Sequence, residues 1–277
     1  MNKNTIVRTL SGIAFLGLML CGLLINKWAF AALMCFVLVC MLVEFYRMTM
    51  GSDYRVSQGL AVFAGLTFFV LMFLASAFEQ ITMKYVALTF LPMAIIMINS
   101  LYAKDKSEFS KFSHLYTGLV YIAVPIALSN LIVFRGGEFS GLLILSFFII
   151  IWSSDVGAFC FGMALGQKYG KKLFPSISPK KSWIGFWGGL LCAVIAAVVM
   201  NLTGMLSYPM VHCIILAVLM DVAGVYGDLF ESQWKRHFDV KDSGNIIPGH
   251  GGMLDRFDSA LFAIPVGALY LLIFGLI

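Results

Sequence analysis

The sequence predicts an all-α, polytopic integral membrane protein with about nine transmembrane helices and a cytoplasmic N-terminus. Three observations lead to this prediction. Apolar residues make up 61% of the 277 residues, charged residues only 12%, and the apolar residues are gathered in long runs. A soluble domain carries about 25% charged residues and would expose too much apolar surface with this composition. Disorder requires low hydrophobicity and high charge, so it is excluded as well.

Nine apolar runs approach the length of ~20 residues that a helix needs to cross the hydrocarbon core. They are residues 10–26, 28–46, 59–79, 83–102, 115–134, 141–163, 184–203, 210–229 and 255–277. Each is expected to be helical, because the bilayer offers the backbone no other hydrogen-bond partners. The first run is interpreted as a span and not as a signal peptide, since no small-residue cleavage site follows it.

The basic residues orient these spans. The N-terminus and the loops after the even-numbered spans hold 16 of the 19 Lys and Arg residues, and the other side holds 3. Cytoplasmic loops are enriched in Lys and Arg, so the first side is expected to be cytoplasmic. The same topology accounts for the net charge of +5, and no nucleic-acid partner is expected.

The two halves of the chain differ in character. Residues 1–140 are expected to form an N-terminal region of about five spans with short loops. Residues 141–277 contain two long basic loops and most of the acids that lie within spans. This second region is therefore predicted to be the catalytic one.

Acidic residues within the later spans indicate a functional site, because carboxylates inside a membrane are costly and usually face a cavity or a partner. Asp228 ends the eighth span, and Asp255 and Asp258, three residues apart on one helix face, begin the ninth. These three are expected to converge at the cytoplasmic boundary and to hold a divalent cation such as Mg²⁺, which takes oxygen ligands. The alternative is a structural network of the same acids with Lys235, Arg236, Lys241 or Arg256.

Three other acids are less specific. Asp155 lies within the sixth span and Asp221 within the eighth. For Asp221, a buried and hydrogen-bonded acid is at least as good an interpretation as a functional one. Glu44 is three residues before Arg47 and is interpreted as one half of a helix-end ion pair.

Two loops suit phosphate groups. In the loop 242–252, three glycines surround His250 just before the ninth span, and glycines allow backbone N–H groups to turn toward one anion. In the loop after the sixth span, Ser178-Pro-Lys-Lys-Ser182 combines point charges with hydroxyl donors. An ordinary turn is the alternative for the first loop. The general enrichment of lysine in cytoplasmic loops is the alternative for the second.

Residues 232–258 resemble the signature of the phosphatidate cytidylyltransferases, also called CDP-diacylglycerol synthases. The matching positions are Ser232, Lys235, Arg236, Lys241, Asp242, Gly244, Pro248, His250, Gly251, Gly252, Asp255, Arg256 and Asp258. The resemblance extends upstream to 227–231, to the end of the sixth span, and to Ser178–Lys181. The first 140 residues are similar only in consisting of hydrophobic helices.

This resemblance implies an enzyme that joins CTP and phosphatidate to give CDP-diacylglycerol and pyrophosphate. It implies Mg²⁺ or another divalent cation on Asp228, Asp255 and Asp258, with a monovalent cation such as K⁺ beside it in some members. By this resemblance, the catalytic residues are those three acids together with Lys241 and Arg256. Substrate binding falls on Ser178, Lys180, Lys181, Ser182, Ser232, Lys235, Arg236, Asp242, His250, Gly251 and Gly252. The expected location is the cell inner membrane, with the site facing the cytoplasm, and a homodimer is a further expectation.

One position departs from the family pattern, because Ile184 stands where members usually carry Glu. The alternative functions are a CTP-dependent kinase of polyprenols or phytol and, from another class, an ion-coupled transporter that uses Asp155 and Asp221. The ending of the signature argues against the kinase. The concentration of unusual residues in one half argues against the transporter, since transporters often have repeat symmetry.

Overall fold

The structure is a computed structural model that describes residues 3–78, 80–102, 106–135 and 137–277, and it is predominantly helical. The α-helices are α1 (Lys3–Leu24), α2 (Lys27–Met50), α3 (Arg55–Ala77), α4 (Phe90–Ser100), α5 (Phe112–Gly118), α6 (Val124–Val133), α7 (Leu142–Phe161), α8 (Gln167–Tyr169), α9 (Trp183–Leu202), α10 (Met210–His237), α11 (Leu254–Phe257) and α12 (Ala260–Ile273). Two 3₁₀ segments, η1 (Met83–Thr89) and η2 (Lys106–Lys111), and two π-helical turns, η3 (Leu119–Ala123) and η4 (Gly162–Gly166), join some of them. The strands form two short antiparallel hairpins, β1 (Phe134–Arg135) with β2 (Glu138–Phe139) and β3 (Lys172–Phe174) with β4 (Ser178–Ser182).

Within the described residues, nine helical stretches are long and apolar enough to cross a membrane. They are Val7–Leu24, Lys27–Met50, Arg55–Ala77, Met83–Ser100, Phe109–Val133, Leu142–Tyr169, Trp183–Leu202, Met210–His237 and Leu254–Ile273. The predicted fold class and number of spans are thereby confirmed. The cytoplasmic N-terminus stays a prediction, and Lys104, one of the basic residues counted for it, lies outside the described residues.

The chain divides into two compact units. Unit 1 comprises residues 1–141 together with 238–256, and unit 2 comprises residues 142–237 together with 257–277. The break after residue 141 falls beside the boundary predicted from the sequence. The segment 238–256, which carries much of the signature, packs with the N-terminal helices.

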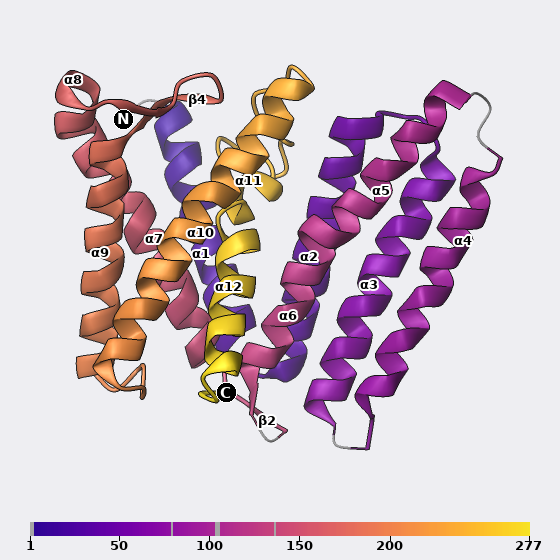
Figure 1. The fold of residues 1–277 in the computed structure, drawn as a ribbon, viewed down its shortest axis with the longest axis horizontal. Helices are drawn as coiled ribbons and strands as arrows, with labels where there is room; N and C mark the ends of the chain where they lie inside the picture. The colour runs from indigo at the N-terminus through magenta and orange to yellow at the C-terminus, as the bar shows by residue number, and fades with distance from the viewer. Residues whose placement is uncertain (1–2, 79, 103–105, 136) are drawn as a thin grey trace. The chain divides into compact units, whose positions relative to one another are not determined.

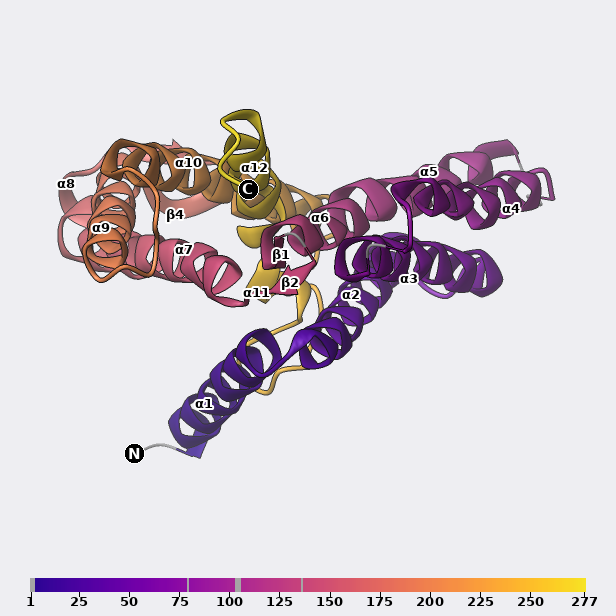
Figure 2. The ribbon, with the colours of Figure 1, turned by 90° about the horizontal axis from the view of Figure 1, so that it is seen from below.

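In unit 1, α2, α3 and the helical run from α5 to α6 lie side by side (Figures 1 and 2). Small residues allow this close packing: a Cβ atom added to Gly65 in α3 would lie 2.8 Å from Leu42 of α2 and 3.1 Å from Ala123 of η3. Buried Tyr46 of α2 donates its hydroxyl proton to the Leu115 carbonyl oxygen of α5 at 2.9 Å. The polar tip of a buried tyrosine therefore has a partner between the helices.

In unit 2, α7 and α9 pack along their lengths, and α10 packs against α9 and α12. The buried face of α9 is formed by small residues at helical spacing, Gly185, Gly189, Ala193 and Ala197. A Cβ atom on Gly189 would lie 3.0 Å from the Ser154 carbonyl oxygen of α7. Close approach of helix backbones through small residues is the usual basis of association inside a membrane.

Two features of unit 2 differ from a set of simple spans. Helix α10 continues to His237, eight residues beyond the predicted end of the eighth span, so Ser232, Lys235 and Arg236 lie on this helix and not in a loop. The ninth span is divided into α11 and α12 by Asp258 and Ser259. The N–H group of Ser259 donates to the carboxylate of Asp258 at 2.6 Å, which places this acid at the start of α12.

The contact between α7 and α9 gives a prediction for stability. Gly157→Ala is expected to destabilise the protein by about 1–3 kcal/mol. The added methyl group would lie 2.7 Å from the Gly188 carbonyl oxygen and from Cβ of Cys192. Thermal unfolding of the purified protein in detergent measures the effect as a lower Tm.

Gly17→Ala in α1 is the control, because its added methyl group meets no atom within 4 Å and alanine is the better helix former. Its Tm is expected to equal or exceed that of the unsubstituted protein. A Gly157→Ala protein as stable as Gly17→Ala would contradict the close packing of α7 and α9.

Candidate functional site

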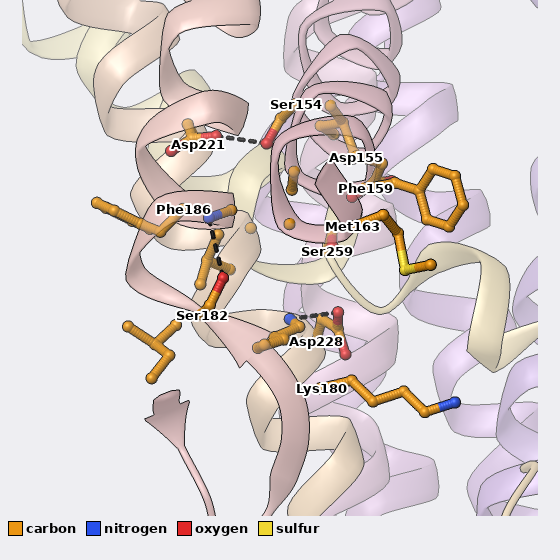
Figure 3. A pocket seen from close by; sticks show the side chains of 18 of the residues that line it. Ser154, Asp155, Phe159, Met163, Lys180, Ser182, Phe186, Asp221, Asp228 and Ser259 are labelled. Atoms are coloured by element: carbon orange, nitrogen blue, oxygen red, sulfur yellow. Dashed lines mark hydrogen bonds and ion pairs between the residues drawn. The ribbon is translucent and has the colours of Figure 1, made fainter. Parts of the chain in front are cut away.

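A cavity of about 500 Å³ lies within unit 2, lined by residues of α7, η4, β4, α9 and α10 and by Ser259 before α12 (Figure 3). Acidic side chains from two helices line it, Asp155 of α7 and Asp221 and Asp228 of α10. Lys180 and Lys181 of β4 also line it, and Figure 3 shows Asp228 and Lys180 at the opposite end of the pocket from Asp221. Phe159, Met163 and Phe186 add apolar surface. The cavity therefore offers both charged and apolar walls.

Asp221 lies at the inner end of this cavity and is 3% exposed. One of its carboxylate oxygens accepts a hydrogen bond from the hydroxyl group of Ser154 (Figure 3). The interpretation of Asp221 as a buried, hydrogen-bonded acid is therefore confirmed. Ser154 follows another serine and precedes Asp155 in an otherwise apolar run, which is the sequence signal that would have identified it.

At the other end of the cavity, Asp228 forms an ion pair with Lys181 and accepts a hydrogen bond from the Ser232 hydroxyl group one turn further along α10, at 3.3 Å. The Asp258 carboxyl group interacts electrostatically with Asp228 and Asp155. The three carboxyl groups are thus close enough to repel one another, and a cation would relieve this repulsion.

The acids of unit 2 meet the requirements of a metal site only in part. Carboxylate oxygens are the ligands that Mg²⁺ prefers, so Asp228 and Asp258 fit by chemistry. In the part of the chain that the structure describes, however, no three His, Cys, Asp or Glu side chains form a group that could hold a metal ion. Lys181 occupies one side of Asp228 instead. Asp228 and Asp258 thus have the chemical groups that a divalent cation requires, and in this structure Asp228 is paired with Lys181.

The other predicted residues of unit 2 have structural contacts. Lys235 forms an ion pair with Glu231, which is fully buried. Arg236 donates to the Ile177 carbonyl oxygen at 3.5 Å and so connects α10 to the hairpin of β3 and β4. Ser178 pairs with Phe174 across that hairpin. The hydroxyl oxygen of Ser182 accepts the Gly185 N–H at 3.2 Å, which caps the N-terminus of α9.

The rest of the predicted site belongs to unit 1. In the segment 238–256, Ile247 and Gly251 form a β-bridge, and Gly249 and Gly251 have φ angles of +75° and +88°. The predicted glycine turn is therefore present, with backbone conformations that favour glycine. Lys241, Asp242 and Arg256 are exposed.

His250 lies beside helix α1. Its Nδ1 is 3.0 Å from the hydroxyl oxygen of Ser11. The same hydroxyl group is within hydrogen-bond distance of the Pro248 carbonyl oxygen, at 2.8 Å, and of the Arg8 carbonyl oxygen, at 3.0 Å. Ser11 thus orients the imidazole ring, a role that no feature of the sequence indicated.

The N–H groups of this segment are directed at two carboxylates of the chain itself. One oxygen of Asp255 accepts from the N–H groups of Ser243 at 2.9 Å and Gly252 at 2.7 Å. The carboxylate of Glu44 accepts from Met253 at 3.0 Å and Leu254 at 2.9 Å. The interpretation of Glu44 as the partner of Arg47 is therefore wrong, because its oxygens face the signature segment. An isolated acid within an apolar span was the signal for such a role.

These features define a class of protein: a polytopic membrane protein with a cavity that has both charged and apolar walls. The chain matches the family described as the cytidylyltransferase family over residues 6–274, and it belongs to that family. The family predicted from the signature is thereby confirmed, and the predicted class of enzyme, a nucleotidyltransferase, agrees with it.

Curated relatives carry the same assignment. The phosphatidate cytidylyltransferase of Staphylococcus haemolyticus is 31% identical over 265 residues, which cover 94% of this chain and 96% of the relative. That of Bacillus subtilis is 49% identical over 117 residues, 42% of each chain, and that of Staphylococcus epidermidis 46% identical over 123 residues, 44% of this chain and 46% of the relative. The last two alignments thus span less than half of the relatives. None of these three relatives is named as a kinase or a transporter.

The first turn of α9 gives a second prediction. Ile184 lies two residues after the helix-capping Ser182, and no acid is present in that turn. Because an acid near a helix N-terminus stabilises it by about 0.3–1 kcal/mol, Ile184→Glu is expected to leave the Tm in detergent unchanged or slightly higher.

Ile195→Glu is the matched control, since Ile195 is 52% exposed in the middle of the same spanning helix and an acid within a membrane is costly. It is expected to reduce the yield of folded protein in membranes. If Ile184→Glu reduced the yield of folded protein in membranes as much as Ile195→Glu does, the start of α9 would have no room for the family's acidic residue.

Proposed function

We propose that this protein joins CTP and phosphatidate to give CDP-diacylglycerol and pyrophosphate, in the cell inner membrane and with its site toward the cytoplasm. The cavity of unit 2 carries this proposal, because it combines lysines and carboxylates with an apolar wall in a family of cytidylyltransferases. The 16 basic residues predicted to lie on one side support the orientation. The oligomeric state, including the expected homodimer, stays a prediction.

The reaction requires positioning more than covalent chemistry. An oxygen of the phosphatidate phosphate forms a bond to the α-phosphorus of CTP, and the bond from that phosphorus to the bridging oxygen of the β-phosphate breaks. Pyrophosphate leaves with the electron pair. No side chain is consumed, so catalysis consists of aligning two anions and neutralising the charge that develops between them.

Named residues suit each part of this task. Lys180 and Lys181 supply positive charge for the phosphates at the polar end of the cavity. Phe159, Met163 and Phe186 supply an apolar wall for the lipid. Phosphate binding near Lys181 would compete with its ion pair to Asp228. Release of that carboxylate is then linked to substrate binding.

Roles for the signature residues remain part of the proposal. Asp228, Asp255 and Asp258 would hold Mg²⁺, which when bound neutralises phosphate charge and polarises the reacting phosphorus. A monovalent cation such as K⁺ beside it stays a prediction. Lys241, Arg256 and His250 supply further positive or donor groups for the anionic substrates.

Product analysis tests the reaction. Purified protein is incubated with Mg²⁺, with CTP carrying label at either the α- or the γ-phosphate, and with either phosphatidate or a polyprenol as the acceptor. We expect α-label in a lipid and γ-label in pyrophosphate. Transfer of γ-label to a lipid alcohol with release of CDP would identify a kinase and would overturn the proposal.

Metal dependence tests the acidic ligands. Asp258→Asn and Asp255→Asn are each expected to lower activity at least about 10-fold and to raise the Mg²⁺ concentration that gives half-maximal activity, because each removes an anionic oxygen ligand. Titration of activity with Mg²⁺ after chelation measures both effects.

Asp53→Asn is the control, since Asp53 pairs with Lys111 outside this cluster. Its activity and its Mg²⁺ requirement are expected to match the unsubstituted enzyme. Normal turnover in Asp255→Asn would remove that residue from the metal-binding set.

A further inference from the structure

We infer that Glu44 of α2 is a positioning residue, whose carboxylate holds the segment Ser243–Leu254 and thereby sets the orientation of Asp255. All of these residues belong to unit 1. Glu44 is 8% exposed, and both of its oxygens accept hydrogen bonds from this one segment, which follows it by about 200 residues in the chain. The part of this inference that concerns turnover rests on the proposed function.

The contact is specific for a carboxylate. Oε1 accepts from the Met253 N–H at 3.0 Å, and Oε2 accepts from the Leu254 N–H at 2.9 Å. Met253 and Leu254 are themselves buried. Buried N–H groups need acceptors, and two neighbouring N–H groups that point the same way suit a group with two acceptor oxygens.

Ser243 extends this contact to Asp255. Its hydroxyl oxygen is 3.0 Å from Asp255 Oδ2 and 3.4 Å from Glu44 Oε2. A hydroxyl group has one proton, so it donates to the nearer Asp255 while it stays against Glu44. Its N–H group also donates to Asp255 Oδ2 at 2.9 Å. A chain of polar contacts therefore leads from Glu44 on α2 through Ser243 to Asp255 in the signature segment.

The segment also fits closely around the Glu44 carboxylate. A Cβ atom on Gly252 would lie 2.6 Å from Glu44 Oε2, and one on Gly244 would lie 2.7 Å from the Glu44 carboxyl carbon. Both glycines belong to the signature. Glycine is needed at both positions because any larger residue would collide with the Glu44 carboxylate. The phosphate interpretation of this loop did not include a side chain at that place.

The substitution Glu44→Gln distinguishes the effect of the carboxylate charge and acceptors from the effect of side-chain size. Glutamine has the same shape, but it replaces one acceptor oxygen with an NH₂ donor that would face a backbone N–H group. Either Met253 or Leu254 then loses its acceptor, and the segment loses its fixed position. Glu44 is not a catalytic residue in this view, because the contacts given above are all with the segment itself.

Hydrogen–deuterium exchange in the ligand-free protein, monitored by mass spectrometry, tests the contact directly. In Glu44→Gln, amides of residues 242–256 are expected to exchange faster, by about 10-fold or more, while α3 and α9 keep their protection. Glu138→Gln is the matched control, because Glu138 is exposed on β2. Unchanged exchange over 242–256 in Glu44→Gln would overturn the inference.

Kinetics separate positioning from a merely structural role. Per folded molecule, and well below the Tm, kcat of Glu44→Gln is expected to fall about 10–100-fold. The Mg²⁺ concentration that gives half-maximal activity is expected to rise in the same variant, because Asp255 is a proposed metal ligand whose position depends on this segment. A purely structural role would lower the Tm and leave kcat per folded molecule unchanged, and that result would overturn the inference.

Two further comparisons keep the test decisive. If Glu44→Gln fails to fold, Ser243→Ala removes the hydroxyl hydrogen bond to Asp255 and keeps both the N–H bond to Asp255 and the contacts of Glu44 with Met253 and Leu254. It is expected to lower kcat with the Tm preserved, and wild-type kcat would overturn the inference. If the unsubstituted protein shows no CDP-diacylglycerol synthesis, the proposed function fails, and the exchange experiment alone decides the role of Glu44.

Discussion

Burying a carboxylate among apolar helices is costly unless a donor or a cation meets it, and this requirement accounts for much of the polar structure of the protein. Four acids within spans have such partners. They are Glu44 with the N–H groups of Met253 and Leu254, Asp221 with Ser154, Asp228 with Lys181, and Glu231 with Lys235. Three of the four partners come from another segment of the chain. These hydrogen bonds and ion pairs therefore fix the positions of segments relative to one another. Contacts between apolar side chains are less specific for one position, whereas a hydrogen bond requires a particular donor and acceptor.

The cavity of unit 2 depends on this combination of polar and apolar contacts. Glycines bring α7 and α9 together at the level of Gly157 and Gly189, and the hairpin of β3 and β4 leads directly into α9 through the capping Ser182. Lys181 of β4 is thereby held close to Asp228 on α10. The cavity thus has helix backbones on its sides and the ion pair of Lys181 with Asp228 at one end.

The N-terminal helices have a role beyond that of an anchor in the membrane. Helix α1 contacts His250 through Ser11, and helix α2 contacts the following residues through Glu44. Two side chains from the least distinctive part of the sequence thus fix two places in the most distinctive part. This arrangement explains how a loop rich in glycine keeps one conformation, since its backbone donors have partners within unit 1.

The sequence alone determined the fold class, the number of spans and the family, because these depend on composition, on the length of apolar runs and on residues close together in the chain. It left open whether Asp221 is a buried structural acid and whether the glycines around His250 form an ordinary turn. It could not identify the partners of Glu44 and His250, or the pairing of Lys181 with Asp228. Those pairs join residues about 50 to 240 positions apart, and only packing of the helices decides which donor reaches which acceptor. A carboxylate within an apolar span is visible in the sequence as a group that requires a partner, and the tertiary structure decides which partner it has.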